Sequence, residues 1–278
     1  MTLTVVDALS LPGDATKANE DAWGQDGDAA VVLDGATMLG DGLMPGPSDA
    51  AWIAQFGVRR ILAHLREGAG ARKALRGALG DAKKSFEALR RMPPEDLWQT
   101  PCASMMLAVR DGAQVEFLWF GDCAALLLQG DGPVVTIGET FASKSDESGF
   151  AATLARQSGK AATDRAHFTE ALRARRNRIN SGDNWLFTPE PKAAAHAGRR
   201  IVKMRPGAHL LLASDGFAAL ASDYGVYDAN RLMAAAREKG LVALGEELRA
   251  IENEDAAGAR FARFKKSDDA TAILLRVD

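Results

Sequence analysis

The chain has 278 residues, of which 47% are hydrophobic and 26% charged, a composition typical of folded globular proteins. That length allows a full hydrophobic core, which excludes a chain disordered throughout. Its 34 basic and 37 acidic side chains nearly cancel, to a net charge of −3, so no overall field favours nucleic acid or an anionic membrane as a partner.

The N-terminus lacks the basic segment and long apolar core of a signal peptide, and no stretch approaches the roughly 20 apolar residues of a membrane span. We therefore expect a cytoplasmic protein. The two cysteines, Cys102 and Cys123, lie in or beside apolar runs, where buried reduced thiols are expected, although a disulfide is left open.

The N-terminal part predicts three strands. Residues 3–9 are rich in β-branched types, and residues 22–24 and 29–33 flank a hairpin turn. Antiparallel pairing of that hairpin would place Asp21 and Asp34 at comparable heights. Because an Asp at the tip of a buried aliphatic strand is held in one place, Asp34 has the rigid position that a metal ligand needs.

Two amphipathic helices are expected next. Ser48 is a suitable N-cap for the first, which ends at the glycines around Gly68, and the second covers residues 71–92 before Pro93. Their apolar stripes predict that they cover one face of a sheet.

The middle of the chain has short apolar runs separated by hairpin-length turns, which predict an antiparallel meander rather than a parallel α/β fold. The expected strands are 103–109, 115–120, 124–128 and 134–137.

The polar residues at about 143–196 interrupt this pattern and predict a flap-type insertion with a helix over 164–177. The arginines of that helix indicate either a solvated face or a flap that meets an anionic or phosphorylated partner. Afterwards the pattern predicts strands 200–204 and 209–213, helices 228–239 and 241–252, and a last strand at 272–277.

Without repeats or low-complexity linkers, we expect a single domain over residues 1–278 that acts as a monomer. The predicted fold is α+β, with two stacked antiparallel sheets between helical layers.

Acidic residues stand at the ends of several predicted strands. No group of His and Cys competes with them, and carboxylates with backbone carbonyls select Mg²⁺ or Mn²⁺ over zinc. The acidic positions are Glu20, Asp21, Asp34, Asp122, Asp215 and Asp268.

In order along the chain, the sequence has Asn-Glu-Asp at 19–21, Asp-Gly at 34–35, Gly-Asp at 121–122, Ser-Asp-Gly at 214–216 and Asp-Asp-Ala-Thr at 268–271. These motifs cover nearly the whole chain and together resemble the metal-dependent protein phosphatase 2C family. The resemblance implies an α-β-β-α sandwich with helix pairs outside, a binuclear Mn²⁺ or Mg²⁺ site, and a metal-bridging hydroxide that attacks phosphoserine or phosphothreonine on a protein substrate.

By the same resemblance, Asp34 would bridge both ions and the Gly35 carbonyl would bind the first. Asp215 and Asp268 would bind the second ion, and Asp122 would help to hold a third, weaker one. Glu20 and Asp21 would orient metal-bound waters.

The sequence departs from the family at three places. Thr16 stands where an arginine usually grips the substrate phosphate, and the adjacent Lys17 is our candidate replacement, although a lysine offers one point charge instead of a bidentate fork. Ala36 and Thr37 follow Asp34-Gly35 where most members have another glycine or a histidine, and Asp269 stands where many have Asn.

Three other functions can be compared with the sequence. A phosphatase fold without catalysis would bind a phosphoprotein partner through the basic insertion, although all the acidic ligand positions are filled. A haloacid-dehalogenase-type phosphatase with Asp34 as nucleophile would need a second acid at position 36, which is Ala36. A kinase or ATPase is disfavoured because no Gly-rich phosphate loop with a following lysine is present.

Overall fold

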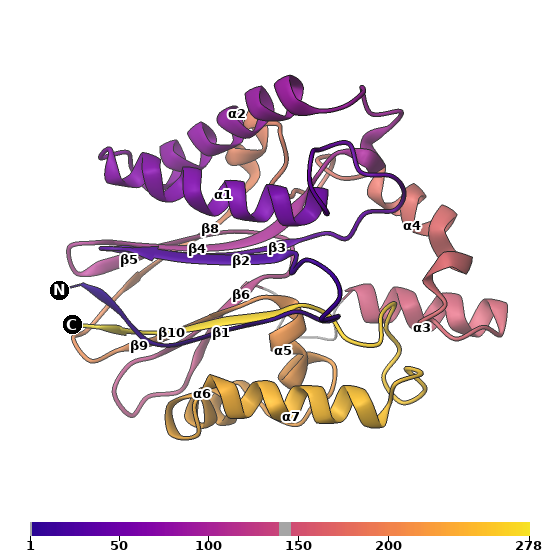
Figure 1. Cartoon of the computed structure of the whole chain (residues 1–278). Coiled ribbons are helices and arrows are strands. Elements are labelled where there is room, and N and C mark those ends of the chain that lie inside the picture. Colours follow the sequence, from indigo (N-terminus) through magenta and orange to yellow (C-terminus); the bar gives the residue numbers. More distant parts are fainter. Residues whose placement is uncertain (1, 139–145) are drawn as a thin grey trace.

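The computed structural model describes residues 2–138 and 146–278 (Figure 1). Two five-stranded antiparallel sheets are stacked between helical layers, and their strand orders are β1-β10-β9-β6-β7 and β2-β3-β4-β5-β8. Helices α1 and α2 cover the second sheet, whereas α5, α6 and α7 lie against the first (Figure 1). The predicted α+β class with four layers is therefore confirmed, with three helices instead of a pair on one side.

The strands are β1 (Leu3–Leu11), β2 (Asp21–Asp26), β3 (Ala29–Gly35), β4 (Ala103–Asp111), β5 (Gln114–Phe120), β6 (Ala124–Leu128), β7 (Val135–Ile137), β8 (Gly198–Lys203), β9 (His209–Ala213) and β10 (Ala270–Val277). The α-helices are α1 (Asp49–Arg66), α2 (Ala71–Leu89), α3 (Asp146–Ser158), α4 (Thr169–Arg176), α5 (Asp215–Ser222), α6 (Ala229–Glu238) and α7 (Leu241–Glu254). Three 3₁₀ turns are η1 (Leu97–Gln99), η2 (Arg165–Phe168) and η3 (Pro191–His196).

Strand β3 has a continuous apolar sequence because both of its faces are covered. Val31 and Leu33 pack in the core under α1 and α2, whereas Ala30 and Val32 pack in the core between the sheets. A third core lies between the first sheet and α5, α6 and α7. Strand β3 is therefore a fixed support for the residue at its end.

The meander predicted for residues 103–137 is wrong in one respect. Strands β4 and β5 form a hairpin in one sheet, but β6 and β7 pair in the other, so Gly121 and Asp122 connect the two sheets. The free edge of β5 is taken instead by β8, which comes from much later in the chain. A connection of hairpin length does not by itself distinguish a hairpin from a crossing between stacked sheets.

The region 146–196 contains more structure than predicted. The helix expected over 164–177 is a 3₁₀ turn, η2, followed by α4, and α3 precedes them. Residues 143–145 of the expected insertion lie outside the described residues. The assignment of 143–196 as an insertion in a single domain stays a prediction.

Both ends of the described chain lie on the same side of the molecule (Figure 1). Backbone hydrogen bonds join Thr2 to Asp278 in both directions, at 2.9 and 3.0 Å. The register of β1 with β10 pairs Leu3 with Val277 and Leu11 with Ala270, so Asp268 lies at the opposite end of that strand pair. No helix in the described ranges has the length and apolar character needed to cross a membrane.

Candidate metal centre

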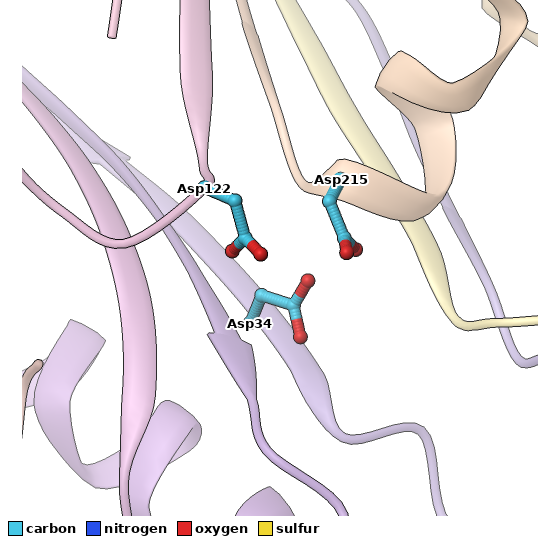
Figure 2. Close-up of side chains that lie close together, drawn as sticks. All are labelled: Asp34, Asp122 and Asp215. Atoms are coloured by element: carbon cyan, nitrogen blue, oxygen red, sulfur yellow. The ribbon is translucent and has the colours of Figure 1, made fainter. Parts of the chain in front are cut away.

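Three carboxylates from distant parts of the chain converge at one edge of the sheets. Asp34 ends β3, Asp122 lies between β5 and β6, and Asp215 begins α5. One oxygen of each lies within 4.8 Å of the others, and their side chains point toward one another (Figure 2). The convergence predicted for Asp34 and Asp215 is present, together with Asp122.

A glycine beside each carboxylate allows close packing at this edge. A Cβ on Gly35 would lie 2.6 Å from the Glu20 carbonyl oxygen and would also overlap that of Ala50 in α1. A Cβ on Gly216 would overlap the Asp269 carbonyl. Gly121 has φ +60°, in the left-handed region that favours glycine. These glycines therefore let the sheets and α1 approach closely enough to bring the acids together.

Asp21 lies beside Asp34 because the two residues are partners in the β2–β3 register, as predicted. Its Oδ2 accepts a hydrogen bond of 2.8 Å from Ser214 Oγ, which joins the two sheets immediately before Asp215. The other oxygen, Oδ1, is buried and has no hydrogen-bond partner among the described residues. A buried carboxylate oxygen left unpaired normally carries a large free-energy cost.

The acids raise one another's pKa. Burial raises the pKa of Asp21 from 3.8 to about 7, and the charges of Asp268 and Asp269 add to this while the Ser214 hydrogen bond opposes it. Burial also raises the pKa of Asp34 well above its ordinary value, and the charges of its aspartate neighbours raise it further. For Asp122, burial is again the main cause of a raised pKa. Negative charge is therefore concentrated at this edge and unfavourable there without cations.

The donor set fits a hard divalent cation. The converging ligands are carboxylate oxygens, which suit Mg²⁺ and Mn²⁺. The unpaired Asp21 Oδ1 and the mutual repulsion of Asp34, Asp122 and Asp215 are both relieved by positive charge placed among them.

Asp268 does not belong to the group of three converging carboxylates. Its Oδ1 lies 2.5 Å from Lys265 Nζ and accepts a hydrogen bond of 2.9 Å from the Asp269 backbone N–H. Burial would raise the pKa of Asp268, but the Lys265 ammonium and the Asp269 N–H together hold it below its ordinary value. Its charge still acts on Asp21, Asp34 and Asp122, so it lies in the same electrostatic site.

The Glu20 side chain anchors the start of α1. Ser48 Oγ, the N-cap, donates a hydrogen bond of 2.6 Å to Glu20 Oε1, and Thr37 Oγ1 donates to Oε2. Glu20 is thereby fixed beside Asp21 and Asp34. Its predicted role in orienting metal-bound water stays a prediction.

Thr16 and Lys17 lie in the loop between β1 and β2. Thr16 donates from its N–H and hydroxyl to Asp14 Oδ1, at 2.9 and 2.7 Å. Lys17 Nζ lies 3.7 Å from Asp14 Oδ2, with a side chain 77% exposed. The prediction that Lys17 and Thr16 bind substrate phosphate would require Lys17 to turn away from Asp14.

The arginines of region 146–196 hold the loop that follows Gly35. Arg165 and Arg176 donate to the Thr37 carbonyl at 3.3 and 2.8 Å, and Arg173 donates to the Leu39 carbonyl while its guanidinium stacks on Trp98. The interpretation of this segment as a solvated helix face is therefore wrong for these three arginines.

Sequence reasoning missed Lys265 and Ser214. The three-residue spacing of Lys265 and Asp268 was visible, but only the folded chain shows that the two side chains meet beside the other acids. Ser214 stood inside the Ser-Asp-Gly motif, and its contact with Asp21 depends on the stacking of the two sheets.

A family model described as protein phosphatase 2C matches residues 14–251. The fold is similar to that of the Mycobacterium tuberculosis serine/threonine phosphatase PstP/Ppp, with 18% identity, TM-score 0.59 and full coverage of both chains. It is also similar to the PPM Ser-Thr phosphatase MsPP from Mycobacterium smegmatis in complex with cacodylate, with 18% identity, TM-score 0.55 and coverage of 99% of this chain and 100% of that one.

The catalytic domain of PstP in complex with 2 manganese ions matches with 19% identity and TM-score 0.55, over 100% of this chain and 99% of that one. No curated protein sequence matches significantly. Because the family model spans most of the sequence, the chain belongs to the protein phosphatase 2C family.

Proposed function

We propose that the protein is a Mn²⁺- or Mg²⁺-dependent phosphatase that hydrolyses phosphoserine and phosphothreonine on proteins. The observation that carries the proposal is the convergence of Asp34, Asp122 and Asp215 within a protein phosphatase 2C fold. The solved PstP domain with 2 manganese ions supports the choice of metal by similarity of fold.

In this proposal, Asp34, Asp122 and Asp215 hold two or three divalent cations, with the Gly35 carbonyl and Asp268 as further ligands. Bound ions would lower the pKa of water, screen the phosphate charge and align the attacking and leaving oxygens. Asp21 is held toward Asp34 by Ser214, and Glu20 fixes the start of α1. Both acids would orient water at the site.

The test is hydrolysis of p-nitrophenyl phosphate and of phosphoserine peptides with and without Mn²⁺. We expect EDTA to stop turnover and Mn²⁺ to restore it, and Asp34→Ala to lower turnover by on the order of 10²-fold or more. Circular dichroism and thermal melting would check that the variant remains folded.

Two outcomes would count against the proposal. Mn²⁺-dependent turnover that persists in Asp34→Ala would show that Asp34 is not part of the active site. Restoration of turnover by zinc alone would contradict the assignment of hard oxygen ligands to Mn²⁺ or Mg²⁺. Phosphopeptide binding without any turnover by the wild-type protein would favour a phosphatase-fold binding module.

A further inference from the structure

A cavity opens beside the metal centre, between α5, α7 and the segment 255–268. Its empty volume is about 550 Å³, including its mouth toward solvent. Its lining includes two acids of the site, a third acid, a lysine and two aromatic side chains. These are Asp215, Asp268, Glu252, Lys265, Tyr224 and Phe261. A ligand in this cavity would therefore touch both the metal centre and an apolar wall.

Lys265 brings positive charge to this cavity. Its ammonium lies 2.5 Å from Asp268 Oδ1, and its side chain lines the cavity and is 28% exposed. The cavity's other lining cation, Arg263, is committed to the backbone and to Asp255, at 2.9 Å. Lys265 is thus the lining cation that lies at an acid of the site.

The segment that carries Lys265 is held firmly. Asp255 accepts hydrogen bonds from the backbone N–H groups of Ala259, Arg260 and Phe261, at 2.8 to 3.0 Å. Burial opposes ionisation of Asp255, but these bonds and Arg263 lower its pKa to about 2. The turn at residues 259–261 and the Arg263 side chain, which come shortly before Lys265, are therefore held in place by Asp255.

We propose that this cavity is the substrate site, in which Lys265 binds the phosphate and the Tyr224–Phe261 wall takes an apolar side chain next to the phosphorylated residue. The inference rests on the proposed phosphatase function. A phosphate ester approaching the concentrated carboxylates is repelled, and an ammonium at their border compensates that repulsion through a charge-assisted hydrogen bond.

The Tyr224–Phe261 wall of the cavity suits an apolar group. The Tyr224 and Phe261 rings lie 4.9 Å apart. Glu252, which also lines the cavity, accepts a hydrogen bond from Tyr224 Oη at 3.3 Å and pairs with Arg249 at 2.6 Å, so its charge is compensated. An aromatic or large aliphatic side chain fits this wall better than a charged one.

The first test compares Lys265→Met with Lys266→Met, an exposed neighbour that does not line the cavity. Equilibrium binding of inorganic phosphate is measured on the Mn²⁺-loaded protein, and Mn²⁺ affinity is measured separately by electron paramagnetic resonance. We expect Lys265→Met to weaken phosphate binding about ten-fold or more, and Lys266→Met to change it by less than about three-fold.

Unchanged phosphate affinity in Lys265→Met would overturn the proposal. So would tighter Mn²⁺ binding without loss of phosphate binding, because Lys265 would then be only a counter-ion of Asp268. If the wild-type protein binds phosphate through Lys265 but hydrolyses no ester, the proposed function fails and the phosphate assignment stands.

The second test uses two phosphoserine peptides that differ only in having Phe or Ser beside the phosphoserine. We expect a lower KM for the Phe peptide and loss of that difference in Phe261→Ser, with thermal melting and Mn²⁺ affinity as the checks that the variant is folded. Equal KM values for the two peptides in the wild-type protein would overturn the proposal that this wall binds an apolar side chain of the substrate.

Discussion

Asp269 accepts backbone hydrogen bonds with both of its carboxylate oxygens, from Gly13 at 2.7 Å and from Glu20 at 2.6 Å. It therefore ties the loop before β2 to the segment before β10. An asparagine has one acceptor oxygen and would turn its NH₂ group toward one of these N–H donors. These two hydrogen bonds explain why position 269 carries an aspartate, although its negative charge lies next to that of Asp268.

We expect Asp269→Asn to lower the free energy of unfolding by about 1–3 kcal/mol, since one backbone donor loses its partner. Urea unfolding of the metal-free protein would measure the change. Asp26→Asn serves as a control because Asp26 pairs with Arg66 at an exposed position, where about 0–1 kcal/mol is expected. Equal losses in the two variants would argue against a special role for Asp269.

The raised pKa of Asp21 predicts a pH dependence. Folded Asp21 titrates at about 7 instead of 3.8, so the folded state binds its proton more tightly than the unfolded state. The contribution of Asp21 to stability should therefore be lost as the pH rises from about 4 to about 7, by at most about 1.4 kcal/mol per pH unit.

Urea unfolding of metal-free wild type and Asp21→Asn across that range would isolate the effect, because other titrating groups are common to both. We expect the stability of the wild type to fall relative to the variant as the pH rises. Parallel curves would show that Asp21 ionises normally.

The junction of β3 with α1 sets the position of Asp34 at the scale of elements. The Gly35 N–H donates to the Glu20 carbonyl at 3.0 Å, and the space for a Cβ is filled by the Glu20 and Ala50 carbonyls. The first turn of α1 thus packs directly on the end of the strand.

We expect Gly35→Ala to destabilise the protein by about 1–3 kcal/mol through overpacking and to weaken Mn²⁺ binding by shifting Asp34. Thermal melting and Mn²⁺ titration would measure the two effects. Gly149→Ala is the matched control: this exposed glycine in α3 has nothing within 4 Å of the added Cβ, so we expect a gain of roughly 0.5–1 kcal/mol. An unperturbed Gly35→Ala variant would contradict this account of the junction.

Elements with a complete local signal were predictable from the sequence. The apolar run of β3, the Ser48 cap of α1 and the stripes of α6 and α7 each depend on nearby residues. Helix α5 was missed because Ser214-Asp215-Gly216 is also typical of a turn after a strand, and the helix is stabilised by burial of Phe217 and Leu220 in the third core. The crossing from β5 to β6 was not predictable locally, because the strand that pairs with the edge of β5 is β8, which lies much later in the sequence.

At the scale of the whole molecule, region 146–196 is joined to the segment that leads to Asp268. Phe264, 3% exposed, packs against Phe150 of α3 and Phe168 of η2, with ring centroids 6.0 and 6.2 Å apart. On the other side, the arginines of η2 and α4 hold the loop after Gly35. The region thus connects the loops around Asp34 and Asp268, a long-range relation that the sequence alone did not reveal.

We expect Phe264→Ala to make region 146–196 unfold locally more often. Truncation of a buried Phe costs about 3–5 kcal/mol, and the hydrophobic cluster around Phe264 is small. Limited trypsin digestion should then cut faster at the arginines of η2 and α4. Leu97→Ala, at a side chain 48% exposed, is the control. Equal cleavage rates in the two variants would show that Phe264 does not hold the region.

The paired hydrogen bonds between Thr2 and Asp278 make the chain nearly a closed loop, at the end of the β1–β10 pair away from Asp268. A short peptide linking these two residues would turn the polypeptide into a ring and leave the acids and the cavity untouched. Ring closure restricts the unfolded chain far more than the folded one, so a cyclised form should gain on the order of a few kcal/mol in stability. The same proximity suits the molecule to circular permutation, with new ends opened at the exposed Asp111-Gly112 turn.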